Sequence, residues 1–119
     1  MAATICKDIE LWASAKSYTD IFYIGCNYFS SETLQKAFTE SFKFIHVCSI
    51  DKDDLVFCAN ELWEDFEDCL INRAAEKVNA DYLITRDVKG FERSNIKVVT
   101  PAHLVERLRD RGLVYDILR

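Results

Sequence analysis

The fold can be read most directly from residues 63–91, which run WEDFEDCLINRAAEKVNADYLITRDVKGF. The first part, from about Asp65 to Asn79, has the spacing of an amphipathic helix, because apolar side chains recur at steps of four residues. These side chains are Phe66, Leu70, Ala74 and Val78. Residues 81–85 follow as a short apolar strand, and residues 86–95 form a polar loop. The stretch therefore predicts a helix that leads into a strand, with a loop behind it.

The same alternation of helices and strands extends over the rest of the chain. Further strands are expected at residues 9–14, 43–50 and 96–100. Further helices are expected from about Ser17, after a cap at Ser31, over 52–60 after a cap at Asp51, and from Pro101 after a cap at Thr100. Strands that alternate with helices favour an α/β fold, in which helices cover both faces of a parallel sheet.

Helical spacing also predicts which faces of the first two helices are buried. In the first helix the expected stripe comprises Tyr18, Ile21, Phe22, Gly25 and Phe29. In the second it comprises Leu34, Phe38 and Phe42. We therefore expect these two helices to contribute apolar faces to the core.

Length and charge limit the possible functions. The 119 residues suffice for one domain and are too few for two. The formal net charge is −5, whereas a protein that holds nucleic acid through its own basic surface is usually positive. This charge counts less against a metal-dependent nuclease, in which carboxylates hold cations that face the phosphate. No apolar run is long enough for a membrane span, and the first residues do not resemble a signal peptide, so we expect a cytoplasmic protein.

The cysteines and histidines are expected to be structural. The cysteines are odd in number and lack the C-x-x-C spacing of zinc or redox sites, so they are predicted to be reduced, mainly core residues. They are Cys6, Cys26, Cys48, Cys58 and Cys69. His46 lies within an expected strand and is predicted to pack in the core. His103, in the first turn of the last helix, is expected to be solvated.

Acidic residues near strand ends and helix starts are the candidates for chemistry. They are Asp20, Asp65, Asp68 and Asp87, and Asn72 shares one side of its helix with Asp65 and Asp68. Carboxylates that converge at one edge of a sheet repel one another unless a cation lies among them, and hard oxygen ligands suit Mg²⁺ or Mn²⁺. Such ions support hydrolysis of phosphodiesters. The alternative is that these residues only cap helices and interact favourably with the helix dipole.

Family resemblance favours the first interpretation. The stretch 63–91, followed by Ile96-Lys-Val-Val-Thr-Pro101, closely resembles the C-terminal half of PIN domains, above all VapC-type toxins of toxin–antitoxin pairs. Residues 14–24 resemble the strand-to-helix passage that holds the family's second acidic residue. The resemblance implies a three-layer α/β/α fold and a Mg²⁺- or Mn²⁺-dependent ribonuclease. It assigns catalytic and metal-binding roles to Asp20, Asp68 and Asp87, with Asp65 as an auxiliary ligand, and it implies an antitoxin-like protein partner.

The sequence departs from the family pattern at its start. PIN domains begin with a central strand that ends in an Asp-Thr-Asn-like motif, and residues 1–8 resemble the end of a helix instead. We therefore expect a single PIN-like domain over 1–119 that is incomplete at its N-terminus. In the family, this first strand lies in the middle of the sheet. Without it we expect a gap between strand 9–14 and strand 81–85, whose N–H and C=O groups would lack their partners. The gap closes by direct pairing of these strands, by recruitment of the chain's own N-terminus, or by exchange of elements in a homodimer, and we favour the homodimer.

Two functions follow from these observations. The first is an RNA-cleaving enzyme that uses Asp20, Asp68 and Asp87, with Arg86 or Lys89 either meeting substrate phosphate or remaining solvated. The second is a non-catalytic PIN remnant that acts as a protein-binding or dimerisation module. Thr85 either hydrogen-bonds near the metal or only completes its strand.

Overall fold

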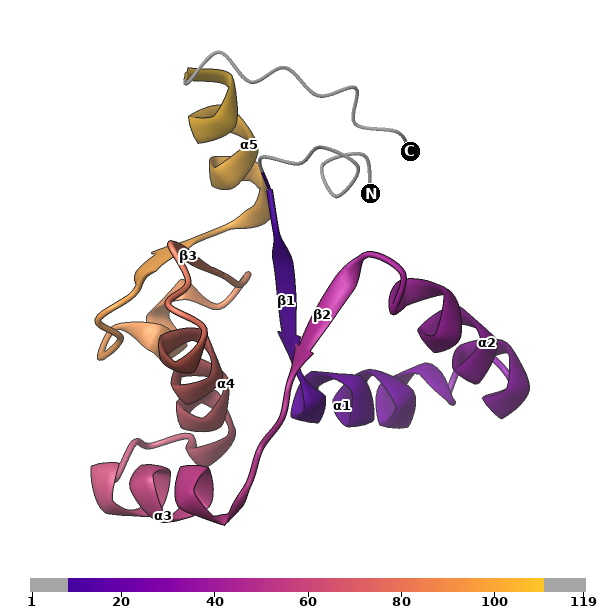
Figure 1. The fold of residues 1–119 in the computed structure, drawn as a ribbon, viewed down its shortest axis with the longest axis horizontal. Coiled ribbons are helices and arrows are strands. Elements are labelled where there is room, and N and C mark those ends of the chain that lie inside the picture. Colours follow the sequence, from indigo (N-terminus) through magenta and orange to yellow (C-terminus); the bar gives the residue numbers. More distant parts are fainter. Residues whose placement is uncertain (1–8, 111–119) are drawn as a thin grey trace. The chain divides into compact units, whose positions relative to one another are not determined.

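The computed structural model describes residues 9–110, and these residues form two compact units. The first unit extends to Ile50 and the second begins at Asp51. Each unit combines helices with a pair of parallel strands (Figure 1). In the described part of the chain, no helix is long and apolar enough to cross a membrane.

The first unit contains two strands and two helices. In chain order they are β1 (Leu11–Ser14), α1 (Ala15–Gly25), α2 (Ser31–Ser41) and β2 (Ile45–Cys48). Both helices begin earlier than the sequence predicted: Ser14 caps α1, and Ser30, rather than Ser31, caps α2. The backbone N–H of Lys16 donates to the Ser14 hydroxyl at 3.1 Å, and that of Thr33 donates to the Ser30 hydroxyl at 3.1 Å. Each serine therefore satisfies an N–H group that its helix leaves unpaired.

Aromatic rings join α1 to α2. The Tyr18 ring lies 5.0 Å from the Phe38 ring and 5.2 Å from the Phe42 ring, and its hydroxyl is hydrogen-bonded to Ser41. Gly25 lies close against Leu34, which is buried. The expected stripe of α1 is only partly confirmed, since Ile21 and Phe29 are exposed. The rings at Tyr18 and Phe22 turn toward α2, so the buried face is narrower than the sequence predicted.

His46 is not the core residue that the sequence predicted. In the parallel register of β1 and β2 it pairs with Trp12, and the two rings stack with centroids 4.9 Å apart. The His46 side chain is 56% exposed, and its Nε2 lies 4.0 Å from Glu10. The prediction failed because strand alternation, rather than the apolar neighbours in the sequence, decides which side chains reach the core.

The second unit contains the stretch that first suggested the fold. Its elements are α3 (Lys52–Glu61), α4 (Phe66–Lys77), β3 (Tyr82–Ile84), the 3₁₀ helix η2 (Val88–Phe91), β4 (Lys97–Val99) and α5 (Pro101–Asp110). The predicted cap at Asp51 is confirmed and forms a capping box with Asp54. Asp65, for which the sequence offered capping as the alternative to a ligand role, caps α4. The Thr100 hydroxyl accepts from the His103 backbone N–H at 3.1 Å, and His103 is exposed as expected.

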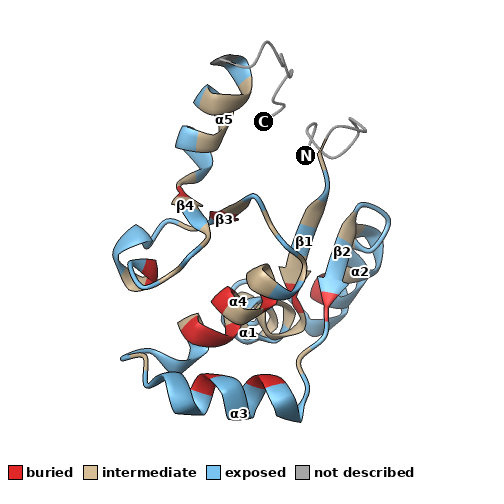
Figure 2. Cartoon of the chain, turned by 60° about the vertical axis from the view of Figure 1, so that its left-hand side comes forward, coloured by how far each residue is buried: buried red, intermediate tan, exposed pale blue. Residues whose placement is uncertain are grey.

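Buried side chains of the second unit concentrate where α3 packs against α4 (Figure 2). Among them is one carboxylate, Asp54, whose side chain is only 3% exposed. Its oxygens accept from Arg73 Nε at 3.0 Å and from Lys77 Nζ at 2.7 Å. The Arg73 guanidinium also lies 4.3 Å from the centre of the Phe57 ring. An ion network therefore links the start of α3 to the second half of α4.

All four expected strands form, and they pair in parallel. β1 pairs with β2, and β3 pairs with β4, as two separate two-stranded sheets within residues 9–110. The predicted α/β fold with parallel strands is therefore confirmed. The loop predicted at 86–95 contains η2, a turn of helix that the polar sequence did not indicate.

Three of the cysteines lie in the core, as expected. Cys48, Cys58 and Cys69 are buried free thiols, whereas Cys26 ends α1 and is exposed; Cys6 lies outside the described residues. Burial, together with a hydrogen bond to Cys58, raises the pKa of the Cys69 thiol to about 12. Cys69 is therefore a protonated packing residue and has little thiolate character.

Candidate active site

Two of the predicted acidic residues meet at Gly90. The Cβ of an alanine at this position would lie 2.7 Å from Oδ2 of Asp87 and 2.8 Å from Oδ2 of Asp68. Both carboxylate oxygens therefore face one small volume directly beside the Gly90 backbone. Gly90 has an ordinary backbone conformation, so a glycine is not needed here for an unusual φ angle. Its lack of a side chain leaves room for the two carboxylates. The sequence marked this position only as a glycine in a polar loop.

Asp68 reaches this point from the first turn of α4. Its backbone N–H donates to Oδ1 of Asp65 at 3.1 Å, so the cap of the helix fixes the turn that carries it. The next residues, Cys69 and Leu70, are buried and hold the other side of the turn in the core. The N-terminal end of a helix carries partial positive charge, which favours a carboxylate there.

Asp87 reaches the same point from the end of β3. The Thr85 backbone N–H donates to the Val99 carbonyl at 3.0 Å, which extends the pairing of β3 with β4. The Thr85 hydroxyl accepts from the Asp87 backbone N–H at 3.1 Å, and Oδ1 of Asp87 accepts from the Gly90 N–H at 3.2 Å. Thr85 therefore both completes its strand and orients the acid. The second oxygen of Asp87, Oδ2, lies beside Gly90.

A buried amide anchors the chain beyond Gly90 to the same side of α4. Asn72, one helical turn after Asp68, accepts a short hydrogen bond from the Ser94 hydroxyl and donates to Glu76 at 3.2 Å. The Ser94 hydroxyl in turn accepts from the Ile96 backbone N–H at 3.0 Å. The sequence placed Asp68 and Asn72 on one side of the helix, and this is confirmed. Through Ser94, Asn72 holds the chain beyond Gly90 against α4.

The two other predicted ligands, Asp65 and Asp20, each interact with a group in their own helix. Asp65 uses Oδ1 to cap α4. Asp20 belongs to the first unit, where its carboxylate pairs with Lys16 Nζ at 2.6 Å, one helical turn away. Its place beside Asp68 and Asp87 stays a prediction. Within residues 9–110, no three His, Cys, Asp or Glu side chains form a group that could hold a metal ion.

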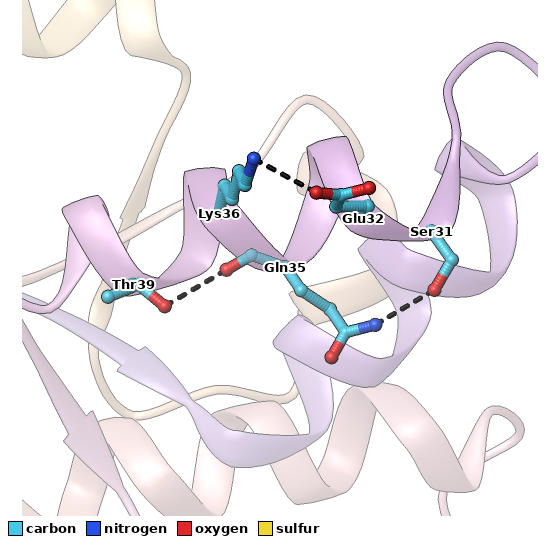
Figure 3. A pocket seen from close by; sticks show the side chains of 5 residues that line it. All are labelled: Ser31, Glu32, Gln35, Lys36 and Thr39. Atoms are coloured by element: carbon cyan, nitrogen blue, oxygen red, sulfur yellow. Dashed lines mark hydrogen bonds and ion pairs between the residues drawn. The ribbon is translucent and has the colours of Figure 1, made fainter.

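A shallow surface pocket lies on the first unit. It is lined by Ser31, Glu32, Gln35, Lys36 and Thr39, all on one side of α2 (Figure 3). These side chains bond within the helix itself: Gln35 donates to Ser31 at 2.8 Å, and Lys36 pairs with Glu32 at 3.0 Å. The pocket is therefore a solvated helix face.

Comparison with known proteins identifies the family. The sequence model described as "PIN domain" matches residues 1–89, a stretch that includes Asp20, Asp68 and Asp87. No curated protein and no solved structure matches the chain. PIN domains are generally nucleases. The match covers well over half of the sequence and includes both carboxylates that converge at Gly90. The chain therefore belongs to the PIN domain family.

Proposed function

We propose that the chain is a ribonuclease that depends on Mg²⁺ or Mn²⁺ and hydrolyses RNA phosphodiesters. The observation that carries this proposal is the convergence of Asp68 and Asp87 on the space beside Gly90. Two carboxylates that share one small volume repel each other. A role as a helix cap or a loop acid does not explain why they are placed together. A site built for a cation explains the arrangement better than capping does.

The donor set fits the proposed cation. Carboxylate oxygens are hard ligands of the kind that Mg²⁺ and Mn²⁺ prefer. Asp68 and Asp87 would hold the ion, and Asp20 is the proposed further carboxylate. A bound ion of this kind lowers the pKa of a water molecule and offsets the charge of the phosphodiester.

The chain's own residues supply orientation and charge around that point. Thr85 and the Gly90 N–H fix the Asp87 carboxylate, and the cap at Asp65 fixes the turn that carries Asp68. The side chains of Arg86 and Lys89 are exposed on either side of Asp87 in the sequence. In the proposed reaction they contact phosphates of the substrate as charge-assisted donors.

The test is Mn²⁺ binding, measured by calorimetry, together with cleavage of a mixed RNA pool. Asp68→Asn and Asp87→Asn should each weaken binding and cleavage by at least about 10–100-fold, the range seen even for residues that only support a metal ligand. Asp81→Asn, an exposed acid just before β3, is the matched control and should behave as wild type. Equal binding and cleavage in all four proteins would reject the proposal. Cleavage by none would leave the binding-module alternative.

We extend the proposal to the toxin class, on the strength of the likeness of residues 63–101 to VapC-type toxins. A toxin of this kind arrests growth when it is expressed without its antitoxin partner. The same variants therefore give a second readout: induced wild-type chain and Asp81→Asn should arrest a bacterial host, and Asp68→Asn should not. Growth that is unaffected by an RNA-cleaving wild-type chain would remove the toxin assignment and leave the nuclease.

We also propose that the protein forms a homodimer. In the first unit, large apolar side chains are exposed on α1 and just after it, among them Tyr23, Ile24, Tyr28 and Phe29. Clusters of this kind are characteristic of protein–protein contacts. Light scattering coupled to gel filtration should give twice the chain mass, and Tyr23→Glu with Tyr28→Glu should restore the monomer mass. A monomer mass for the wild-type chain over a wide concentration range would contradict this proposal.

A further inference from the structure

Trp63 is held in a fixed position at the start of the α4 region. Its ring meets the Phe91 ring edge-to-face, with centroids 6.2 Å apart. The Arg93 guanidinium lies over the same ring, 5.6 Å from its centre. Arg93 is itself tethered, because its Nη1 donates to the Leu62 carbonyl at 3.2 Å. Trp63 and Arg93 therefore form a stack whose two members are each restrained by a second contact.

Two short stretches of chain connect this stack to the acid pair. Phe91 is buried and directly follows Gly90 in η2, so the ring that supports Trp63 adjoins the residue at which Asp68 and Asp87 meet. Trp63 also lies two residues before Asp65, the cap that fixes the turn of Asp68. Since adjacent Cα atoms are about 3.8 Å apart, the residue that supports Trp63 lies directly beside the residue at which the two acids meet.

The surface around the stack is open. Arg93 is exposed, Trp63 is half-buried, and Leu62, which ends α3 in the left-handed conformation, is 82% exposed. A planar guanidinium stacked on an indole presents a flat cationic face. Unpaired RNA bases stack on such aromatic and arginine planes, whereas bases within a duplex do not offer their faces.

We propose that Trp63 and Arg93 form a base-stacking subsite that holds single-stranded RNA next to the Asp68–Asp87 pair. This inference rests on the proposed nuclease function and deepens it, because it names two residues that bind the substrate. Stacking provides most of the attraction, and the exposed cations Arg86, Lys89 and Arg93 are the phosphate contacts available along this segment.

The charge of the protein gives this subsite a measurable signature. The net charge is −5, so non-specific attraction to the RNA backbone is weak. With three cations in contact, the slope of log affinity against log salt should be no steeper than about −2, since each phosphate contact to a single strand contributes about −0.7. Binding dominated by a broad basic surface would give a much steeper slope.

The experiment uses the two tryptophans of the chain, Trp12 and Trp63. In Trp12→Phe the only indole is Trp63, and in Trp63→Phe the only indole is Trp12. Each full-length variant is titrated with a short oligoadenylate RNA in EDTA, which keeps cleavage out of the measurement. Saturable quenching is expected in Trp12→Phe and not in Trp63→Phe. Trp12 is a matched control because it also stacks on a neighbouring side chain, His46.

Affinity provides a second readout. Trp63→Ala should weaken binding of the oligoadenylate by about 5–100-fold, the range for losing one stacked base, whereas Trp12→Ala should leave it within about twofold. Trp63→Phe keeps an aromatic ring on Phe91, so it should retain part of the affinity even if Trp63→Ala folds poorly. Unchanged affinity in both Trp63 variants, or equal quenching by a duplex of the same sequence, would overturn the subsite.

The outcomes separate this inference from the nuclease proposal. Quenching at Trp63 without metal-dependent cleavage would keep the subsite and reject the enzyme. Cleavage that depends on Asp68 and Asp87, with affinity and KM unaffected by Trp63→Phe or Trp63→Ala, would keep the enzyme and reject the subsite.

Discussion

Asp54→Ala is expected to lower the free energy of unfolding by about 3 kcal/mol, the low end of the range for removing one partner of a buried ion pair. The reason is that the Arg73 and Lys77 charges lose the carboxylate that accepts from both. Their side chains are 28% and 29% exposed, so water can compensate part of the loss. Urea denaturation at neutral pH measures the change.

Two further variants isolate the cause. Asp53→Ala changes an exposed acid in the same first turn of α3 and should cost less than about 1 kcal/mol, since it alters only the favourable interaction with the helix dipole. Asp54→Asn keeps an oxygen for the Asp51 N–H, which now donates to Asp54 at 3.0 Å, but removes the charge. Equal losses in Asp53→Ala and Asp54→Ala would show that the ion network contributes little.

The stabilisation by Asp54 should also depend on pH. Burial opposes ionisation of this carboxylate, but hydrogen bonds from Lys77, the Asp51 backbone and Arg73 outweigh it. The pKa of Asp54 is therefore held well below its ordinary value of 3.8. A lowered pKa stabilises the fold fully above the ordinary value and progressively less as pH falls below it. The difference in unfolding free energy between wild type and Asp54→Asn should shrink in that range.

Local signals in the sequence predicted much of the second unit. Asp51 and Thr100 were identified as caps from their places before apolar-periodic segments, and each accepts from the expected turn. A cap works within three or four residues, so its pattern is visible in a short stretch. The convergence of Asp68 and Asp87 was also expected, because the carboxyl ends of parallel strands and the adjoining helix starts share one edge.

Contacts between distant residues explain what the sequence did not predict. Asp54 resembled an ordinary solvated acid in a first turn, and only Arg73 and Lys77, 19 and 23 residues away, make it a buried ion centre. His46 resembled a core residue, and its pairing with Trp12 across the sheet places it on an exposed face. Gly90 carried no signal beyond being a turn residue, since its role depends on where two other side chains end.

Gly90→Ala is expected to separate the proposed metal site from the stability of the fold. A Cβ at this position would lie within 2.8 Å of both carboxylate oxygens, a distance that forces at least one of them to move. Oδ1 of Asp87 is tied to the Gly90 N–H and Asp68 sits in a capped turn, so the displaced groups would leave their common volume. Mn²⁺ affinity should fall by at least about tenfold, comparable to losing a residue that orients a metal ligand.

The same substitution should leave the unfolding free energy within about 1 kcal/mol, because replacing glycine by alanine in an ordinary backbone conformation restricts the unfolded chain and offsets part of the steric cost. Gly25→Ala is the control: its Cβ would lie 2.8 Å from a Leu34 methyl carbon, an equally close contact with no carboxylate involved. It should alter stability through Leu34 and leave Mn²⁺ binding unchanged. Wild-type affinity in Gly90→Ala would mean that Asp68 and Asp87 do not bind one ion together, and the proposed chemistry would lose its structural basis.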